Sequence, residues 1–324
     1  MASRRWKSFL VAVRDIDHPP RALLTKATRI AKQFGGRLEL LHVIAQPYVL
    51  PGGNLTIEQT KQSEIERLQK KLARTAARLA KIDVKVTAKV IWDYPAADAI
   101  VRHVMSSKPD VVIAESHHHN KVARWFVTHT DWELIRACPC PLWLVKTSKL
   151  APTVRALAAI DPFHTHSKPA ALDEEVLRAG AIVASDKGRL GAVHIYTLPV
   201  TMVAGGMGEP VWVPVSAAEL KRARQHALEA VNDSADRYDI KKPDRLLEAG
   251  DPALELPALT KKWKTTLLVM GAVSRSALRR VFIGHTAERV IDAVHCDVLV
   301  VKPRSFKSPV GKRPNATVIP VPPI

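Results

Sequence analysis

The stretch VVIAESHHHNKVARWFVTHTDWELIRACPCPLWLVK at Val111–Lys146 aligns without a gap with LLVMGAVSRSALRRVFIGHTAERVIDAVHCDVLVVK at Leu267–Lys302. Identical pairs include Arg124/Arg280, Phe126/Phe282, His129/His285, Thr130/Thr286, Ile135/Ile291, Cys140/Cys296 and Lys146/Lys302. A self-match of this length indicates that one structural unit occurs twice in the chain. The repeat therefore predicts two tandem domains of the same fold.

The residues before each copy are also alike. Both halves begin with an apolar run that ends in an acidic residue, Phe9–Asp15 and Ala156–Asp161, and continue with alternating helical and strand-like stretches. We expect helices over 21–34, 57–82, 95–105, 170–185, 216–238 and 252–262, and strands over 35–43, 84–91, 187–195 and 245–248. Strands that alternate with helices are typical of a parallel sheet. The predicted fold is α/β, with two tandem doubly wound five-stranded parallel-sheet, Rossmann-like domains.

The length of 324 residues suits two domains of ordinary size. We place them at residues 1–150 and 151–305, and a proline-rich basic tail at residues 306–324. The two closing strands, Leu142–Lys146 and Val298–Lys302, are expected to contact each other, so that the halves pack as a pseudo-dimer about a pseudo-twofold axis. A homodimer of whole chains stays open.

Composition narrows the class of protein. With 47% hydrophobic and 25% charged residues, the chain has an ordinary globular balance. No apolar run approaches the roughly 20 residues of a membrane span, and the run Phe9–Val13 is too short for a signal peptide. Three cysteines do not suggest a disulfide framework, and the spacing of Cys138 and Cys140 differs from a C-x-x-C redox pair, so we expect them to be packed in the core. A cytoplasmic location follows as the expectation.

The net charge of +18 favours anionic partners through long-range attraction. The basic residues are spread along the chain, however, and no motif interleaves them with aromatic residues. Binding to nucleic acid or to another anionic surface is therefore the last of the three functions that we consider.

Ligands of doubly wound sheets lie beyond the carboxyl ends of the strands, where the strand order reverses. This rule places Asp15 or Asp161 opposite the loop after the fourth strand. In the second half that loop contains Gly271 and Ser274, then nine residues, then Gly284, which precedes a predicted helix. Glycines allow a phosphate to approach the backbone, and a helix N-terminus favours an anion. The alternative is that these glycines only form a tight turn.

This loop resembles the G-x2-G-x9-G-[S/T] phosphate loop of the universal stress protein family, in its tandem, E-type form. The resemblance extends from about Lys7 to Pro303 and is most specific in VFIGHTAERVIDAVHCDVLVVKP and THTDWELIRACPCPLWLVK. It implies the fold described above, in its adenine nucleotide alpha hydrolase-like form, and a role in the stress response. It also implies that some members bind ATP, with the strand-1 aspartate near the adenosine and the glycine loop around the phosphates, whereas others bind no nucleotide.

Residue by residue, the second half keeps part of that pattern. The positions carried over as nucleotide-binding residues are Asp161, Gly271, Ser274, Gly284, His285 and Thr286. Ser274 replaces a glycine and would crowd a phosphate, and His285 replaces the small hydroxyl residue, with Thr286 next to it. In the first half, Glu115, His118 and Thr128 replace the three glycines, and the carboxylate of Glu115 would repel phosphate. The resemblance thus predicts ATP in the second half only.

The first half has a histidine-rich loop instead. His117 and His119 point to one side of an extended segment, and Asp131 follows downstream. Two-domain family members have a similar H-x-H followed by T-x-T-D-W, which Thr128–Trp132 matches. Imidazoles and a carboxylate suit zinc, so we predict a zinc site at these three residues. A polar loop in which Thr130 and Glu133 form a capping box is the alternative.

No nucleophile lies in a recognisable pattern with a base. We therefore expect a stress-response protein that binds a ligand and regulates without turnover, and that is not an enzyme. The alternatives are an ATP-binding protein or slow ATPase that uses the second-half loop, and the anionic-surface binder.

Overall fold

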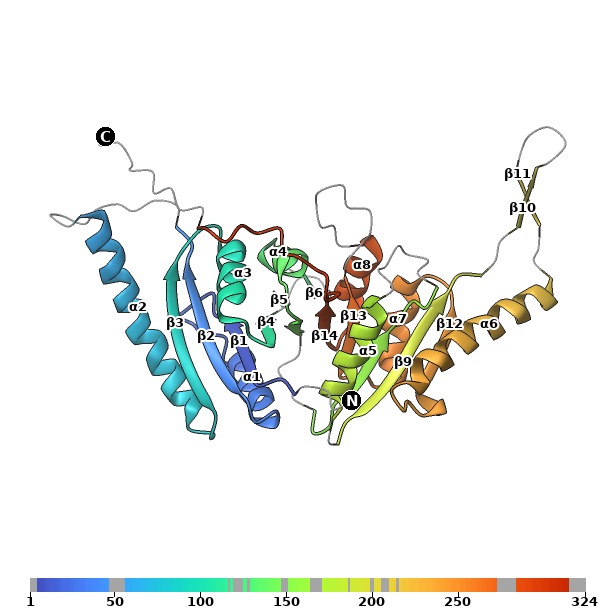
Figure 1. Cartoon of the computed structure of the whole chain (residues 1–324), viewed down its shortest axis with the longest axis horizontal. Coiled ribbons are helices and arrows are strands. Elements are labelled where there is room, and N and C mark those ends of the chain that lie inside the picture. The colour runs from blue at the N-terminus through green and yellow to red at the C-terminus, as the bar shows by residue number, and fades with distance from the viewer. Residues whose placement is uncertain are drawn as a thin grey trace.

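The computed structural model describes residues 5–46, 56–115, 130–146, 151–163, 171–185, 187–198, 216–272 and 284–314 in full, and the backbone alone of 117–118, 125–126, 129, 201–204 and 210–213. Figure 1 shows two α/β units side by side, with helices on both faces of their sheets. The α/β fold and the twofold repeat are as the sequence predicts.

The first half alternates strands and helices along the chain. Its elements are β1 (Ser8–Ala12), α1 (Arg21–Gln33), β2 (Arg37–Ile44), α2 (Ile57–Ala80), β3 (Lys85–Trp92), α3 (Ala96–Ser107), β4 (Val111–Glu115), β5 (His117–His118), β6 (Trp125–Phe126), α4 (His129–Ala137) and β7 (Leu142–Val145). Strands β5 and β6 form a separate two-stranded ladder. Because α4 begins at His129, Thr130 lies inside the first turn, and it is not the cap of a Thr130–Glu133 capping box.

The second half repeats this order. Its elements are β8 (Arg155–Ala159), α5 (Ala171–Val183), β9 (Arg189–Tyr196), β10 (Thr201–Ala204), β11 (Pro210–Val213), α6 (Ala217–Asp236), a 3-10 turn (Lys242–Asp244), β12 (Arg245–Ala249), α7 (Pro252–Lys262), β13 (Leu267–Gly271), α8 (His285–Ala293) and β14 (Asp297–Val301). The antiparallel hairpin of β10 and β11 projects away from the sheet (Figure 1).

The long helices α2 and α6 begin at equivalent capping boxes. In α2 the hydroxyl of Thr56 accepts from the amide of Gln59, whose side chain accepts from the amide of Thr56. Ser216 and Glu219 make the same reciprocal pair in α6. These side chains satisfy amides that have no partner inside a helix, so the local sequence itself sets where both helices begin.

The two halves share one ten-stranded sheet, in the order β12-β9-β8-β13-β14-β7-β4-β1-β2-β3. Each half contributes five parallel strands, and strands β7 and β14 pair antiparallel, with Trp143 opposite Leu299. This confirms the predicted contact between the closing strands. Because these two strands are equivalent in the repeat, their antiparallel pairing relates the halves by a pseudo-twofold axis.

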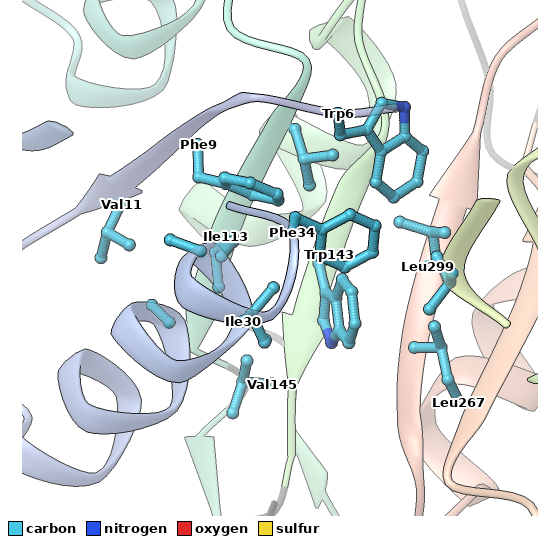
Figure 2. Packing of buried hydrophobic residues seen from close by; sticks show 14 of the residues in the cluster. Trp6, Phe9, Val11, Ile30, Phe34, Ile113, Trp143, Val145, Leu267 and Leu299 are labelled. Carbon is cyan, nitrogen blue, oxygen red and sulfur yellow. The ribbon is translucent and has the colours of Figure 1, made fainter. Parts of the chain in front are cut away.

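The apolar core continues across this junction. Figure 2 shows Trp143 beside Leu299 and Leu267 of the second half, and Phe9 and Ile113 on its other side. All five side chains are buried. Burying such residues on both faces of a parallel sheet makes hydrophobic burial the main source of stability.

A buried polar network also joins the halves. The carboxylate of Asp297 at the start of β14 accepts from Trp143 Nε1 at 2.9 Å and from the amide of Lys146 at 3.1 Å. It also pairs with Lys26 Nζ of α1 at 2.6 Å, and both side chains are less than 5% exposed. The ion pair therefore ties α1 of the first half to the second half.

Two lysines at the junction each donate a hydrogen bond to the other half. Lys146, after β7, donates from Nζ to the carbonyl of Val294 at the end of α8 at 3.0 Å, whereas Lys302, after β14, donates to the carbonyl of Arg136 in α4 at 3.4 Å. A cation at a helix C-terminus satisfies carbonyls and complements the helix dipole. Burial lowers the pKa of both lysines to about 8.

The chain after β14 returns over the first half (Figure 1). Arg304 pairs with Glu175 at 2.6 Å, Phe306 stacks beneath the ammonium of Lys302, and Val310 packs against the hydrophobic core. The segment from Arg304 to Val310 is therefore held by contacts with the rest of the protein.

Candidate functional site

A cavity of about 110 Å³ opens in the second half, where strand order reverses between β8 and β13. Asp161, Gly271, Gly284 and Thr286 of the predicted nucleotide site all line it. The remaining lining is apolar except for His194 and consists of Ala159, Ile160, Val193, Ile195, Pro252, Leu256, Met270, Ala272, Ala287 and Val290. The structure thus brings four of the six predicted residues to one cavity.

Asp161 is the carboxylate of this cavity. It follows β8, is only 3% exposed, and its backbone amide donates to Asp173 Oδ2 of α5 at 2.9 Å. A carboxylate in such a position is costly to bury unless it is hydrogen-bonded. It is suited to accept hydrogen bonds from a ligand that enters the cavity.

Gly271 and Gly284 are glycines for different reasons. A Cβ on Gly271 would lie 2.4 Å from Leu172 Cδ2 of α5, so close helix packing requires a glycine there. A Cβ on Gly284 would meet nothing within 4 Å. Of the two glycines, Gly284 is the one beside open space. It is the N-cap residue of α8, and because it has no side chain, the amides of the first turn of α8 stay accessible to a ligand.

The other two predicted residues do not line the cavity in the described structure. His285 is exposed in the first turn of α8. Ser274 lies outside the described residues. Its role in the loop stays a prediction.

His194 also lines the cavity, although we did not assign it a binding role. Its Nδ1 lies 3.2 Å from the carbonyl oxygen of Ile160, and its ring lies edge-on to Phe163 at 5.6 Å between centroids. His42 Nδ1 makes the same contact, at 2.8 Å, with the carbonyl of Val13 in the first half. Each histidine therefore contacts the backbone directly after the first strand of its half.

The strand register changes the expected match between the acidic residues. Leu10 lies opposite Val112, and Leu157 lies opposite Leu268, which is the residue that aligns with Val112 in the repeat. Counting from these leucines places Arg14 at the position of Asp161. Asp15 lines the first-half cavity, as expected for the acidic residue after the first strand, but it lies one position beyond the residue equivalent to Asp161.

Arg14 changes the chemistry of the first-half cavity, which measures about 140 Å³. Its Nη2 donates to Asp131 Oδ1 at 2.5 Å, and the Asp131 side chain is 1% exposed. Asp131 occupies the position of the apolar Ala287. The second half thus has the carboxylate of Asp161 and the apolar Ala287 where the first half has the ion pair of Arg14 and Asp131.

The predicted zinc site is mostly outside the described structure. His119 and the side chain of His117 lie outside the described residues, whereas Asp131 is described and pairs with Arg14. Among the described residues, no three His, Cys, Asp or Glu side chains form a metal-binding group. The zinc site stays a prediction. Zinc would have to share the Asp131 carboxylate with the guanidinium of Arg14.

Comparisons with known proteins agree with this geometry. The model of the "Universal stress protein family" matches residues 5–146 and 155–302. The chain is 26% identical over 313 residues to Universal stress protein E of Escherichia coli K12, covering 94% of this chain and 96% of that protein. Universal stress protein E of Salmonella typhi is also 26% identical, with 94% and 97% covered.

Solved structures show the same fold. A putative universal stress protein from Pseudomonas aeruginosa UCBPP-PA14 aligns with a TM-score of 0.66 and 22% identity, over 92% of this chain and 94% of that one. A universal stress protein from Archaeoglobus fulgidus aligns with a TM-score of 0.62 and 16% identity, over 91% and 98%. Within the described part of the chain, no helix is both long and apolar enough to cross a membrane.

Proposed function

The chain belongs to the universal stress protein family, and from this premise we propose that it is a stress-response protein whose second half binds a small ligand without turnover. The observation that carries the proposal is the cavity between β8 and β13. It combines a nearly buried carboxylate at Asp161, apolar walls, and the open N-terminus of α8 at Gly284.

An adenine nucleotide is the ligand that fits these three features. The apolar walls suit a purine, Asp161 can accept hydrogen bonds from the nucleoside, and the α8 amides suit a phosphate. The family resemblance implies the same placement. We therefore propose ATP as the ligand of the second half.

Binding without hydrolysis is the form of this proposal that the lining supports. Among the described cavity residues, the ionisable side chains are Asp161 and His194, and His194 is held against the Ile160 carbonyl. A general base within reach of an attacking water is what hydrolysis would need. A slow ATPase is the alternative, and phosphate release above the uncatalysed background would establish it.

The proposal is tested by titrating the full chain with a fluorescent ATP analogue. We expect saturable binding of one analogue per chain, which Asp161→Asn weakens at least tenfold. Arg14→Ala, at the equivalent position of the first half, is the matched control and should leave the affinity unchanged.

Gly284→Asp and Gly284→Asn separate the role of charge from the role of shape. Both side chains are good helix caps and enter open space, so both variants should fold. Gly284→Asp should abolish binding by repelling the phosphate, whereas Gly284→Asn should retain part of it. Absence of binding to the unmodified protein, or equal binding by Gly284→Asp, would overturn the proposal.

A further inference from the structure

Two cysteines outside the ligand cavity are in sulfur–sulfur contact. Cys138 directly follows α4, Cys140 lies two residues before β7 begins, and their Sγ atoms are 3.7 Å apart. Pro139 and Pro141 restrict the backbone around Cys140. The core packing expected from the sequence is correct for Cys138, which is 1% exposed, but Cys140 is partly exposed.

The charges around the pair distinguish the two sulfurs. The contact between the two sulfurs lowers the pKa of Cys138. The ammonium of Lys302 acts in the same direction, while burial opposes both. The pKa of Cys140 is raised well above its ordinary value by the same contact and by burial. Cys138 is therefore the sulfur that ionises first.

Lys302 comes from the other half of the molecule. It follows β14, its side chain is buried, and its Nζ reaches the carbonyl of Arg136 in α4, two residues before Cys138. Nearby cations are a common means of activating a thiol. The dithiol is thus part of the junction between the halves.

The second half provides an internal comparison at the same positions. Val294 replaces Cys138 and His295 replaces Pro139, so Cys296 has no sulfur at the equivalent neighbouring position. Burial raises the pKa of Cys296 to about 12. The repeat therefore contains one paired dithiol and one buried single thiol in the same structural setting.

We propose that Cys138 and Cys140 form a reversible oxidation site whose oxidant is a hydroperoxide. The Cys138 thiolate attacks one peroxide oxygen, the O–O bond breaks, and a sulfenic acid forms while the other oxygen leaves as water after taking a proton. The Cys140 sulfur then attacks the sulfenic sulfur, displacing a second water and closing the S–S bond. Two thiols and one hydrogen peroxide thus give one disulfide and two waters.

The geometry favours this outcome over a stable sulfenic acid. The second sulfur is already in contact, so the remaining movement to bonding distance of about 2.05 Å is small. A disulfide is reduced when a thiolate attacks one of its sulfurs and passes through a mixed disulfide. A dithiol reductant should therefore restore both thiols by exchange.

The experiment exposes the reduced full chain to hydrogen peroxide, blocks remaining thiols with a maleimide under denaturing conditions, and measures the intact mass. The untreated chain should carry three maleimides, one for each cysteine. The oxidised chain should carry one and lack two hydrogens, and dithiothreitol should restore three. Peptide mapping should place the bond between Cys138 and Cys140.

Variants assign the roles. Cys296→Ser is the matched control and should form the disulfide at the unmodified rate. Cys140→Ser should stop at a sulfenic acid on Cys138 that dimedone captures, whereas Cys138→Ser should give neither product. Lys302→Gln should slow oxidation several-fold while keeping the disulfide.

The unmodified chain alone can overturn the proposal, so folding of the variants is not decisive. Retention of all three thiols after peroxide treatment would do so. Loss of the Cys296 thiol as fast as the other two, or a bond only between chains, would also contradict it.

Discussion

The two halves of this protein share their order of strands and helices, yet they carry opposite charges where their first strands end. Asp161 faces an apolar wall at Ala287 in the second half, whereas Arg14 pairs with Asp131 in the first. The capping boxes and the strand-end histidines, in contrast, are retained in both. The comparison indicates that the two halves share the residues that begin their long helices and contact the ends of their first strands, whereas the residues that face the cavity differ.

The largest expected difference between the halves is in the stability that equivalent residues contribute at the junction of β7 and β14. Lys26 lies three residues after the buried Leu23 of α1, and Glu175 lies three residues after the buried Leu172 of α5. Only Lys26 has a fully buried partner, Asp297. Lys26→Met should lower the free energy of unfolding by about 3–5 kcal/mol, because it leaves a buried carboxylate without its cation.

The matched variant is Glu175→Gln. Its partners Arg178 and Arg304 are 34% and 75% exposed in their side chains, so we expect a loss of about 1 kcal/mol or less. Urea unfolding of both variants measures the difference. Equal losses would show that the Lys26–Asp297 pair has no special role at the junction.

The two cavity glycines test whether packing or a ligand requires them. Gly271→Ala should destabilise the unliganded protein by about 1–3 kcal/mol, because its Cβ overlaps Leu172. Gly284→Ser should change stability by no more than about 0.5 kcal/mol, since the site is open and serine caps helices well. Thermal unfolding without ligand is the measurement, and a reversed order would contradict the packing assignment.

Lys146 and Lys302 should make the free energy of unfolding depend on pH in the alkaline range. The pKa of Lys146 and of Lys302 is about 8 when folded and near 10.5 ordinarily, so the unfolded chain binds more protons between these values. Stability contributed by each lysine therefore rises with pH across this window. Relative to Lys302→Met, the unmodified protein should gain about 2 kcal/mol between about pH 7 and 9.5.

Lys146→Met should show the same trend, because its pKa is shifted in the same direction by the same cause. Comparing each variant with the unmodified protein cancels the titration of other groups. A difference in unfolding free energy that stays constant from pH 7 to 9.5 would sink this prediction.

The shared scaffold should respond equally in both halves. Thr56→Ala and Ser216→Ala each remove one capping box and should each cost about 1 kcal/mol. Agreement between the two losses to within about 0.5 kcal/mol is expected, because the two sites are far apart and independent. Clearly unequal losses would show that the scaffolds have also diverged energetically.

Much of the fold could be predicted from neighbouring residues alone. The repeat predicted two units, and apolar periodicity together with the repeat predicted helices such as α2 and α6 close to their observed bounds. The contact between β7 and β14 followed from two identical units meeting at the same strand. These features can be predicted because the sequence repeat and the apolar periodicity are both read directly from the order of residues along the chain.

The cavity was predicted only in part. Asp161, Gly271, Gly284 and Thr286 line it, but the register error hid Arg14, because which residue faces the cavity depends on pairing with β4. His194 was not predicted as a lining residue, because its place at the cavity depends on how β9 lies beside β8.

The sequence by itself determined that one α/β unit occurs twice and that, of the two copies, the second has glycines at two of the three positions of the loop pattern, Gly271 and Gly284. The tertiary structure decided which atoms meet: Leu172 against Gly271, Arg14 with Asp131, and Lys26 with Asp297. The physical reason is one of distance along the chain. Local order follows from steric and hydrogen-bonding preferences of adjacent residues, whereas packing and buried ion pairs arise between side chains that only the folded sheet brings together.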